Sequence, residues 1–484
     1  MELTLENYDI AIIGGGSAGL VVAIAGVKIG KKTVLIEKHR IGGDCLWTGC
    51  VPSKALLKVA KVAHYLKHSG NYGIDRTEQK IDWGSVKKYI QDAQHTIEEE
   101  HDNPERFRDM GVEVVFGNGH FQNPNTFVVE DSENGKTREI NSKKFVISTG
   151  SRPLIPDIKG LDTCDYLDSE NVWDLEELPS RLLVVGAGPI GIELGQAFHR
   201  LGSMVSIVQR GDRILKKEDC DVSEKMLEYL SADGIEFKLN YTLSEITREN
   251  SKICVSFKEN HTSNGINHVS EVYDKILIAA GRLPNIEGLN LEGIGVHIDK
   301  KGILVNQKLQ THAKNIYAAG DVIGEYLFTH VAAYQAQLLV RNFILPWSRK
   351  INYSVVPWTT FSDPEVARCG LTEEEAREKH GDVDVFLLSQ TDVDRAVADG
   401  ETKGFTKVIT SRWLGKILGV HIVGTNAGEV IHEYVLAMQQ GIPLRKLSGM
   451  MHVYPTYSTS TWRIAAKWIS EGTLVNTIRK IFGK

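Results

Sequence analysis

Two glycine-rich turns, each set between a short apolar strand and a helix, constrain the fold of this chain most. The first follows an expected strand at 10–13 and leads into a helix at 20–29 and a strand at 32–36. The second joins a strand at 182–185 to a helix at 192–201. A GxGxxG turn in this setting is the phosphate-binding fingerprint of dinucleotide folds. The two sets of glycines are Gly14, Gly16 and Gly19, and Gly186, Gly188 and Gly191. The sequence therefore predicts two nucleotide-binding folds in one chain.

The residue that ends the second strand of each unit distinguishes the two predicted sites. Glu37 lies about 20 residues after the first turn, where a carboxylate accepts hydrogen bonds from ribose hydroxyls. The second unit has Gln209 there, followed by Arg210, with Lys216 and Lys217 nearby. Loss of the carboxylate and gain of cations favour a 2′-phosphate, so this site is predicted to prefer NADPH. The alternative is that the cations are solvated surface side chains and that the site takes NADH.

Cys45 and Cys50 predict redox chemistry. Their spacing is unusual for zinc, whose paired thiolates are usually about two to four residues apart, and we predict no metal site. They precede an amphipathic helix expected at 53–67, and a helix N-terminus lowers the pKa of a nearby thiol. Such a pair can close as a disulfide and reopen on reduction. The alternative is a pair of buried structural cysteines.

Composition narrows the expected context of the protein. Six cysteines in 484 residues are too few for a disulfide scaffold. A net charge of −6 argues against a general nucleic-acid binder. The polar start of the chain does not resemble a signal peptide, and no run approaches the ~20 apolar residues of a spanning helix. We expect a cytoplasmic protein with reduced thiols, in which a disulfide is catalytic.

Together, the two dinucleotide folds, the Cys45/Cys50 motif and the run Ala318–Asp321 resemble the class I flavoprotein disulfide reductases. This pyridine nucleotide-disulfide oxidoreductase family includes dihydrolipoamide dehydrogenase, glutathione reductase and mercuric reductase, and the resemblance covers essentially the whole chain. It implies FAD on the first fold, with Asp321 near the flavin ribityl chain, and a nicotinamide nucleotide on the second. It also implies that Cys50 lies against the flavin and that Cys45 attacks the substrate.

The same resemblance assigns further residues. Lys54 is similar to the lysine held near flavin N5, and Glu193 to its carboxylate partner. A cation at that place stabilises the anionic reduced flavin. The alternative is a surface lysine and a glutamate at a helix start. The remaining predicted cofactor contacts lie where the chain crosses between the folds: Thr149, Gly150, Gly281 and Gly320.

The length of the chain, at roughly 150 residues per domain, favours three domains. With the resemblance, the expected class is α/β, with Rossmann-like FAD and NAD(P) domains and an α+β C-terminal dimerisation domain. We place the FAD domain at 1–150 and 275–348, the NAD(P) domain at 151–274, and the domain that forms a homodimer at 349–484. The polar segment 79–109 is expected to be a helical excursion on the surface.

The C-terminal motif departs from the disulfide-specific members of the family. Those members carry His-x-His-Pro-Thr and a following Glu, and the second His is the acid/base for thiol exchange. Here Tyr454 and Thr459 stand at the acid/base and orienting positions. An ordinary phenol titrates near pH 10 and is a poor base, so His452 is the alternative base. The resemblance places Tyr454 against Cys45 of the partner subunit, and the bond before Pro455 is a candidate for a cis peptide.

The tail after Ser460 is expected to be a basic amphipathic helix. It either contacts a membrane surface or packs at the dimer interface. The residues expected on its apolar face are Trp462, Ala465, Trp468, Ile469, Val475, Ile478 and Phe482. Those expected on its basic face are Arg463, Lys467, Arg479, Lys480 and Lys484.

We therefore expect a FAD-dependent oxidoreductase that passes electrons from NADPH through FAD and a Cys45–Cys50 disulfide to an acceptor needing little proton management. Metal ions such as Hg(II) or Cu(II), quinones and sulfur species fit that description. Mercuric reductases share the tyrosine but carry a vicinal cysteine pair in the tail, whereas the last cysteine here is Cys369. One alternative is a dihydrolipoamide dehydrogenase-like enzyme that uses NAD. Another is a flavin-based redox sensor or membrane-associated protein with little turnover.

Overall fold

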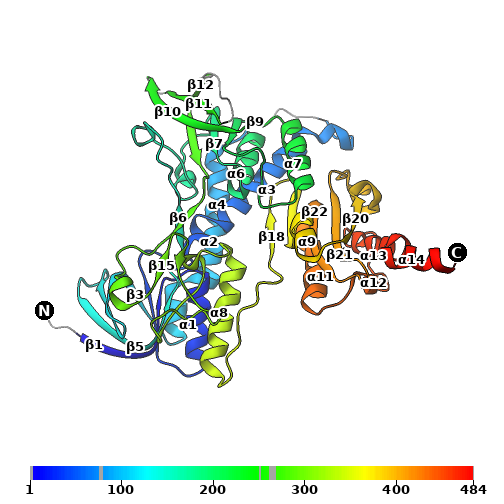
Figure 1. Cartoon of the computed structure of the whole chain (residues 1–484). Coiled ribbons are helices and arrows are strands. Elements are labelled where there is room, and N and C mark those ends of the chain that lie inside the picture. The colour runs from blue at the N-terminus through cyan, green and yellow to red at the C-terminus, as the bar shows by residue number, and fades with distance from the viewer. Residues whose placement is uncertain (1–3, 76–79, 250–251, 261–268, 483–484) are drawn as a thin grey trace.

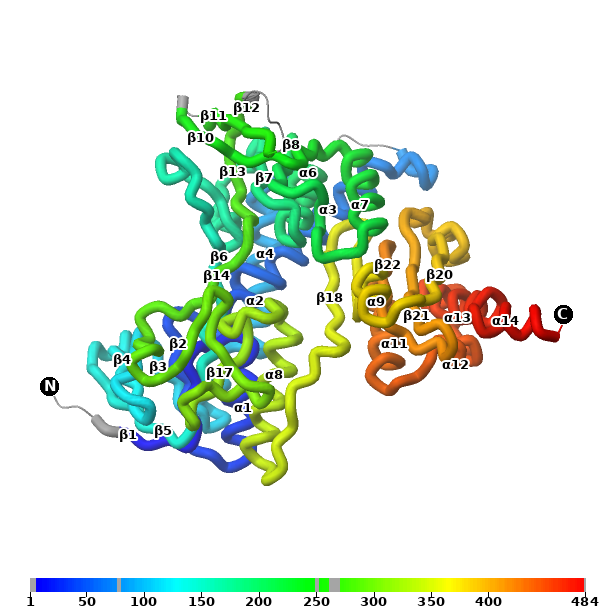
Figure 2. Tube along the Cα trace, in the orientation of Figure 1, coloured from blue at the N-terminus to red at the C-terminus, as the bar shows by residue number. Residues whose placement is uncertain are grey.

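The computed structural model describes residues 4–75, 80–249, 252–260 and 269–482, and its larger sheets lie in three separate bodies (Figure 1). The chain builds most of the first body, passes through the second, returns to the first and ends in the third (Figure 2). This path puts segments far apart in the sequence side by side.

The first body contains a sheet whose central strands are parallel and buried. β1 pairs with β2 and β5, β2 with β3, and β5 with β17, all in parallel, while β4 pairs antiparallel with β3 and β5. The strands are β1 (Thr4–Ile13), β2 (Thr33–Glu37), β3 (Val112–Asn123), β4 (Thr126–Asp131), β5 (Thr137–Ile147) and β17 (Ile316–Ala318). Helices α1 (Ser17–Lys28) and α8 (Thr329–Ile344) pack together beside it. Strand β17 and helix α8 follow the second body in sequence, so the first fold is discontinuous.

The second body repeats the same plan. Its four-stranded parallel sheet has the order β13-β7-β8-β9, with an antiparallel sheet of β10, β11 and β12 beyond it. The parallel strands are β7 (Arg181–Val185), β8 (Met204–Gln209), β9 (Glu236–Leu239) and β13 (Lys275–Ile278). The antiparallel strands are β10 (Tyr241–Glu249), β11 (Lys252–Glu259) and β12 (Val269–Tyr273). Its helices are α6 (Pro189–Arg200) and α7 (Cys220–Asp233).

The third body is an antiparallel sheet of order β18-β19-β22-β21-β20 packed against helices. Its strands are β18 (Pro357–Thr360), β19 (Glu365–Gly370), β20 (Val383–Ser389), β21 (Phe405–Ser411) and β22 (Ile417–Gly424). Its helices are α9 (Glu373–His380), α10 (Asp394–Asp399), α11 (Ala427–Gln439), α12 (Leu444–Leu447), α13 (Thr459–Glu471) and α14 (Thr473–Phe482). The predicted class is confirmed: two Rossmann-like folds and a C-terminal α+β unit.

Two short strands carry the chain between the first two bodies. β6 (Ser151–Pro153) pairs antiparallel with β14 (Arg282–Pro284), so the outgoing and returning segments lie side by side. A further pair, β15 (Ile298–Asp299) and β16 (Gly302–Ile303), belongs to the returning segment. Both crossings directly follow strand ends of the nucleotide folds, where ligands bind in sheets of this kind.

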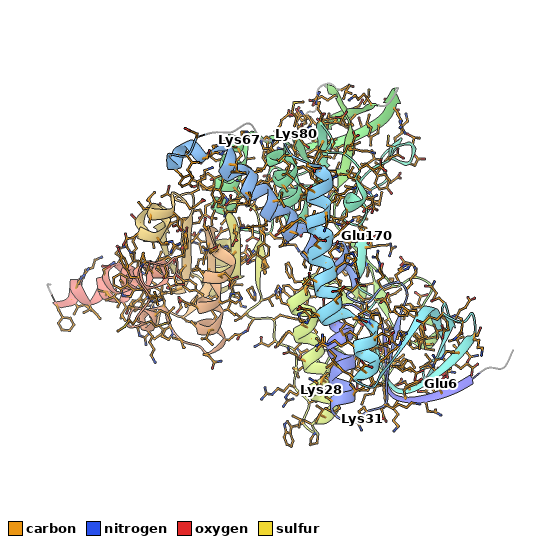
Figure 3. All side chains as sticks on the ribbon, turned by 180° about the vertical axis from the view of Figure 1, so that it is seen from behind. Glu6, Lys28, Lys31, Lys67, Lys80 and Glu170 are labelled. Atoms are coloured by element: carbon orange, nitrogen blue, oxygen red, sulfur yellow. The ribbon has the colours of Figure 1, made fainter. Side chains whose placement is uncertain are left out.

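The segment expected to be a helical excursion on the surface, of which residue 79 lies outside the described residues, is helical, but one face of its main helix is buried. Helix α4 (Trp83–Ile97) runs beside α3 (Cys50–Lys67), as seen from behind in Figure 3. Its buried residues Trp83, Val86, Ile90 and Gln94 form one stripe, and the Trp83 ring lies 5.9 Å from that of Phe198. The segment ends in a π-helical turn and α5 (Pro104–Asp109). The helix was predicted, but its buried side was not, because its apolar residues form one narrow stripe among polar residues.

The tail is two helices, which corrects the expectation of one. Gly472 separates α13 from α14. Ala465 and Trp468 are buried in the third body, whereas α14 buries none of its residues and projects outward (Figure 1). Lys484 lies outside the described residues. Within the described part of the chain, no helix combines the length and apolar character needed to cross a bilayer.

Candidate active site

In the first glycine turn, Gly14 and Gly19 pack against the protein backbone, whereas Gly16 leaves room for a ligand to approach. A Cβ on Gly14 (φ +104°) would lie 2.4 Å from the Ser148 carbonyl oxygen, and one on Gly19 would lie 2.0 Å from that of Gly14. A Cβ on Gly16 would meet only the Gly43 Cα, 4.0 Å away. Gly16 therefore faces the space in which a pyrophosphate fits, at the N-terminus of α1.

Glu37 closes this turn from the end of β2. Its Oε2 accepts a hydrogen bond from the Gly15 N–H at 2.6 Å, and its Oε1 accepts one from the His39 N–H at 2.7 Å. The carboxylate is thus fixed beside the phosphate turn, where the sequence predicted ribose contacts. The donors, the open Gly16 and the acidic residue fit the adenosine half of FAD.

The thiol segment contacts the same turn. Helix α2 (Gly43–Trp47) carries Cys45, and a Cβ on Gly43 (φ +58°) would lie 2.9 Å from the Gly16 Cα. Only glycine permits this approach, because the two backbones nearly touch. The approach places the thiols next to the predicted cofactor site.

Two helix N-termini converge on Cys50. Cys50 is the first residue of α3, so this helix begins earlier than the expected 53–67, and Thr329 is the first residue of α8. Their Sγ and Oγ1 atoms lie 3.3 Å apart. The positive ends of both helix dipoles favour a thiolate at Cys50.

The two thiols differ in acidity. The pKa of Cys50 is lowered to about 6 by a hydrogen bond from Cys45, against the effect of burial, with help from Thr329 and the charge of Lys54. The pKa of Cys45 is raised by the same hydrogen bond and by burial. In the reduced pair, the Cys45 S–H donates to a Cys50 thiolate, so the negative charge resides on Cys50.

The three bodies meet at Glu193, which contacts Lys54 and the backbone of Phe361. The Lys54 ammonium, one turn after Cys50, lies 2.8 Å from Glu193 Oε2 at the start of α6. The Phe361 N–H, just after β18, donates to Glu193 Oε1 at 2.8 Å, and its ring lies 4.6 Å below the Lys54 Nζ. Glu193 is 6% exposed. The predicted pair is brought together, and Phe361 is a neighbour that the sequence analysis missed.

A second polar cluster surrounds Asp321. Ser151 donates to Asp321 Oδ2 at 2.7 Å, and Arg282 lies 3.9 Å from Asp321 and 3.2 Å from Asp44. Burial raises the pKa of Asp321. Gly320 (φ +81°) donates its N–H to Gln335 at 2.6 Å, which fixes the turn. Ser151, Arg282 and Asp44 were not predicted.

The other predicted crossing residues lie at the paired strands β6 and β14. Thr149 donates to the Asn285 carbonyl at 2.6 Å, and the Leu154 N–H donates to the Gly281 carbonyl at 2.9 Å. Gly150 has φ +71°, and a Cβ there would meet no atom within 4 Å. This opening lies at the edge of the first sheet, where the sequence predicted cofactor contacts.

The second glycine turn reproduces the first. A Cβ on Gly186 (φ +111°) would lie 2.4 Å from the Ala279 carbonyl oxygen, and one on Gly191 would lie 2.0 Å from that of Gly186. A Cβ on Gly188 would meet no atom within 4 Å. Gln209 Oε1 accepts from the Ala187 N–H at 3.1 Å, so this neutral amide replaces the carboxylate of the first turn.

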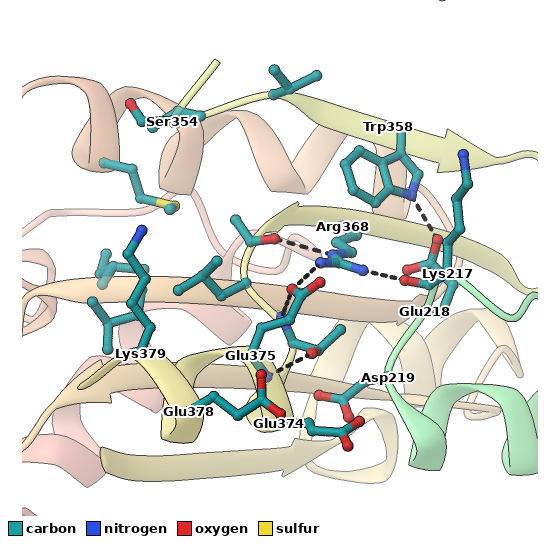
Figure 4. A pocket seen from close by; sticks show the side chains of 18 of the residues that line it. Lys217, Glu218, Asp219, Ser354, Trp358, Arg368, Glu374, Glu375, Glu378 and Lys379 are labelled. Carbon is teal, nitrogen blue, oxygen red and sulfur yellow. Dashed lines mark hydrogen bonds and ion pairs between the residues drawn. The ribbon is translucent and has the colours of Figure 1, made fainter. Parts of the chain in front are cut away.

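The cations after Gln209 are solvent-facing. Arg210 and Lys216 are exposed, and Lys216 borders a cavity of ≈ 850 Å³ between the second and third bodies (Figure 4). This cavity is also lined by Lys217, Trp358 and Arg368.

The C-terminal motif is far from the thiols of its own chain. Tyr454 is 70% exposed, and no hydrogen bond among the described residues joins it or His452 to either cysteine. His452 Nε2 lies 3.3 Å from Glu433 Oε2 of α11, and Thr459 donates to the Thr456 carbonyl at 2.7 Å. The Tyr454–Pro455 bond is cis.

Comparison with known proteins identifies the family of most of the chain. Residues 8–336 match the model of the pyridine nucleotide-disulphide oxidoreductases, and residues 356–464 match the dimerisation domain of that family, which supports a homodimer. Mercuric reductase of Lysinibacillus sphaericus is 36% identical over 458 residues, 93% of this chain and 81% of that protein. Dihydrolipoyl dehydrogenase of Bacillus subtilis is 31% identical over 461 residues, 93% of this chain and 96% of that protein.

A solved structure supports the same conclusion. The Cu(II) complex of the HOCl-induced flavoprotein disulfide reductase RclA from Escherichia coli superposes with a TM-score of 0.85 at 27% identity, covering 95% of this chain and 99% of that one. The relatives are FAD-dependent oxidoreductases with NAD(P)H as electron donor, and the first glycine turn fits FAD. The chain therefore belongs to the pyridine nucleotide-disulphide oxidoreductase family of flavoenzymes.

Proposed function

We propose that the protein passes electrons from NADPH to a soft metal ion, Hg(II) or Cu(II), through the Cys45–Cys50 pair. Bound FAD supplies the hydride-accepting chemistry between the nucleotide and the disulfide. The observation that carries the proposal is the asymmetric thiol pair. Cys50, with a pKa lowered to about 6 mainly by the Cys45 hydrogen bond, is a thiolate near neutral pH, and Cys45 is its proton-bearing neighbour.

Thiolates are the ligands that soft metal ions prefer. Two neighbouring thiols offer two such sulfurs to one ion. Both cysteines are only partly buried, so an ion can reach them. The metal ion is proposed as a substrate that binds to the thiols, is reduced and leaves.

The C-terminal motif favours an acceptor of this kind. Reduction of a disulfide substrate requires a base and acid at the exchanging thiol, the task of a histidine in the disulfide-specific members. Tyr454 stands at that position, and Thr459, hydrogen bonded to Thr456, offers no carboxylate to orient a base. We propose that Tyr454 faces Cys45 of the partner subunit and donates a hydrogen bond to the metal–thiol complex there.

The names of the relatives point the same way. Three of them are mercuric reductases, 36% identical to this chain, and RclA was crystallised with Cu(II). These properties belong to those proteins, and we extend the class of substrate to this chain on the strength of its thiol geometry.

The electron balance requires no other reactant. The Cys45 thiol and Cys50 thiolate lose two electrons and one proton and close as a disulfide, while two Cu(II) ions become Cu(I) or one Hg(II) becomes Hg(0). One NADPH, which gives two electrons and one proton, restores the thiol and the thiolate and leaves NADP⁺. Lys54, held by Glu193, supplies the fixed positive charge beside the site of hydride transfer.

NADPH is proposed as the donor because of the second turn. Gln209 uses its amide oxygen on the Ala187 N–H and places no negative charge near a 2′-phosphate. Arg210 and Lys216 are exposed and free to approach one.

The acceptor is tested by anaerobic titration of the holoenzyme with NADPH, followed by Hg(II), Cu(II), a quinone, lipoamide and oxidised glutathione. Fast reoxidation by the metal ions and slow reoxidation by the two disulfides is expected. Lipoamide turnover faster than metal turnover would overturn the proposal, and quinone turnover in a Cys45→Ser variant would place the reaction away from the thiols.

One observation favours dihydrolipoamide dehydrogenase-like chemistry as a second candidate. His452 lies 3.3 Å from Glu433, so a carboxylate orients an imidazole near the C-terminal motif. If His452 is the base, His452→Gln abolishes lipoamide turnover and Tyr454→Phe does not. Our first proposal expects Tyr454→Phe to slow metal reduction by about tenfold, the scale of one lost charge-assisted hydrogen bond, and His452→Gln to have little effect.

We also propose that α14 contacts an anionic membrane surface. Its apolar residues Ile478, Ile481 and Phe482 are 45%, 69% and 71% exposed, and it carries Arg479 and Lys480 but no acidic residue. A helix of this composition binds an interface by apolar insertion and charge attraction.

Vesicle flotation tests the membrane contact. The holoenzyme is expected to float with phosphatidylglycerol vesicles and not with phosphatidylcholine vesicles, and a chain ending at Gly472 is expected to lose binding. If the shortened chain instead dissociates into monomers and floats unchanged, α14 is part of the dimer interface and the proposal is wrong.

A further inference from the structure

We infer that Trp358, Arg368 and Lys407 of the third body are positioning residues that hold the cationic loop of the nucleotide fold and set its preference for NADPH. The cationic loop is defined as residues 210–219, between β8 and α7. The inference rests on the proposed use of NADPH and adds residues far outside the glycine turn.

Each of the three side chains contacts the end of the loop, and Figure 4 shows Trp358 and Arg368 beside Lys217 and Glu218. The Trp358 indole N–H donates to Glu218 Oε1 at 2.6 Å, and the Arg368 guanidinium donates to the Lys217 carbonyl oxygen. The Lys407 ammonium lies 3.1 Å from Asp219 Oδ2. The loop is therefore fixed by a donor from each of β18, β19 and β21.

These contacts are shielded from water. Glu218, Asp219, Arg368 and Lys407 are 5%, 6%, 5% and 4% exposed. Lys407 also pairs with Asp221 of α7 and Glu373 of α9 at 2.8 Å each. Buried ion pairs are weakly screened and have a defined geometry, so the loop is held in one position relative to the third body.

The middle of the loop is hydrogen bonded to the phosphate turn. The Leu215 N–H donates to the Ala187 carbonyl at 2.8 Å, and the Glu218 N–H donates to the Leu215 carbonyl at 2.8 Å. Leu215 has φ +45°, a left-handed conformation that is costly for a leucine and persists only where the surroundings impose it. Lys216 and Lys217 directly follow this strained residue, so their positions depend on the contacts that impose it.

The same strand reaches the redox centre. β18 carries Trp358, and three residues later the Phe361 N–H holds Glu193, the partner of Lys54. Trp358 and Phe361, three residues apart in one segment of the third body, thus hold the cationic loop and the Glu193 carboxylate. We infer that it sets the distance between the 2′-phosphate cations and the site of hydride transfer.

The inference predicts a specific kinetic pattern. A loosened loop weakens contacts to the 2′-phosphate, which are equal in the ground state and the transition state, so KM for NADPH rises while kcat stays constant. NADH has no 2′-phosphate, so its constants stay unchanged. A merely structural role would lower both activities together.

Trp358→Phe and Lys407→Met are the test variants, with Lys403→Met as the matched control. Lys403 also joins the third body to α7, lying 3.5 Å from Asp233, but does not contact the loop. Trp358→Phe keeps the ring beside Arg368 and removes only the indole donor. Each variant is purified as holoenzyme, its FAD content and thermal midpoint are recorded, and kcat/KM is measured with NADPH and NADH.

We expect the NADPH-to-NADH ratio of kcat/KM to fall about tenfold in Trp358→Phe, the effect of one lost charge-assisted hydrogen bond. Lys407→Met is expected to lower it further, Lys407→Arg to restore it, and Lys403→Met to leave it unchanged. An unchanged ratio in folded Trp358→Phe, or equal losses with both nucleotides, overturns the inference. A wild-type ratio below one overturns the proposed NADPH preference instead, and the change from wild type to variant still tests the positioning role.

Discussion

At the scale of single residues, the proposed chemistry depends on the difference in acidity between two thiols. Cys50 is the first residue of α3 and contacts the Thr329 hydroxyl at the start of α8, while Cys45 lies on α2. A hydrogen bond between the thiols lowers the pKa of Cys50 to about 6 and raises that of Cys45. One thiolate and one thiol are therefore present together near neutral pH.

This asymmetry predicts the pH dependence of the long-wavelength thiolate-to-flavin absorbance of the two-electron-reduced enzyme. Because the pKa of Cys50 is lowered, the band should be present above about pH 6 and disappear as the pH falls through that value. Lys54→Met removes a stabilising charge and should move the midpoint to higher pH. Cys50→Ser should abolish the band. If the band persists in this variant, the thiolate that contacts the flavin is not Cys50.

The residues of the site fall into two groups: those that belong to a short sequence motif and those that only the fold brings to the site. Gly14, Gly188, Cys50 and Asp321 were predicted because each belongs to a short motif whose chemistry depends on neighbours in sequence. Thr329, Phe361 and Arg282 were missed, although Arg282 follows a predicted glycine, because only the folded chain brings them to the thiols, to Glu193 and to Asp321.

At the scale of elements, each glycine turn contains one glycine that is required for packing of the turn and another that leaves space for a ligand. A Cβ on Gly191 would lie 2.0 Å from a backbone oxygen, whereas one on Gly188 would meet no protein atom within 4 Å. The same difference holds between Gly19 and Gly16 in the first turn.

Gly191→Ala and Gly188→Ala therefore form a matched pair. Gly191→Ala should destabilise the holoenzyme by about 2 kcal/mol, because α6 must move away from its turn. Gly188→Ala should keep wild-type stability and FAD content but raise KM for NADPH by at least about tenfold, since its methyl group occupies the phosphate space. Thermal unfolding and steady-state kinetics distinguish the two, and loss of stability in Gly188→Ala would contradict this division.

The elements also mark the limits of sequence reasoning. The βαβ units and the α+β character of the third body were correct because they follow from periodicity and glycine placement. The burial of α4 was not predicted, because its stripe of Trp83, Val86 and Ile90 gains meaning only beside α3 and α6. The tail was mistaken for one helix because its composition is amphipathic on both sides of Gly472.

At the scale of the whole molecule, the thiols and the C-terminal motif are separated within one chain. Tyr454, Met451 and Val453 are 70%, 100% and 78% exposed, and the family of the chain has a dimerisation domain in this region. The predicted boundaries at residues 150, 274 and 348 stay a prediction, as does the shared active site.

Val453→Glu tests whether this surface forms the dimer. A charge buried in an apolar interface is costly, so the variant should dissociate at concentrations where the wild type is dimeric. Monomers should still reduce bound FAD with NADPH but reduce metal ions at least about tenfold more slowly, because Tyr454 is no longer supplied. Sedimentation velocity and kinetics check this, with Met204→Glu, at an exposed position of β8, as a control that should stay dimeric.

The central claim, that electrons reach a soft metal ion through the thiols, is tested most directly by the stoichiometry of copper reduction. NADPH is added to the holoenzyme under anaerobic conditions with Cu(II) and a chelator that reports Cu(I). Two Cu(I) should form per NADPH oxidised, and the rate should fall at least about a hundredfold in Cys45→Ser and Cys50→Ser. Full copper reduction in either serine variant, or oxidation of NADPH without formation of Cu(I), would contradict the claim.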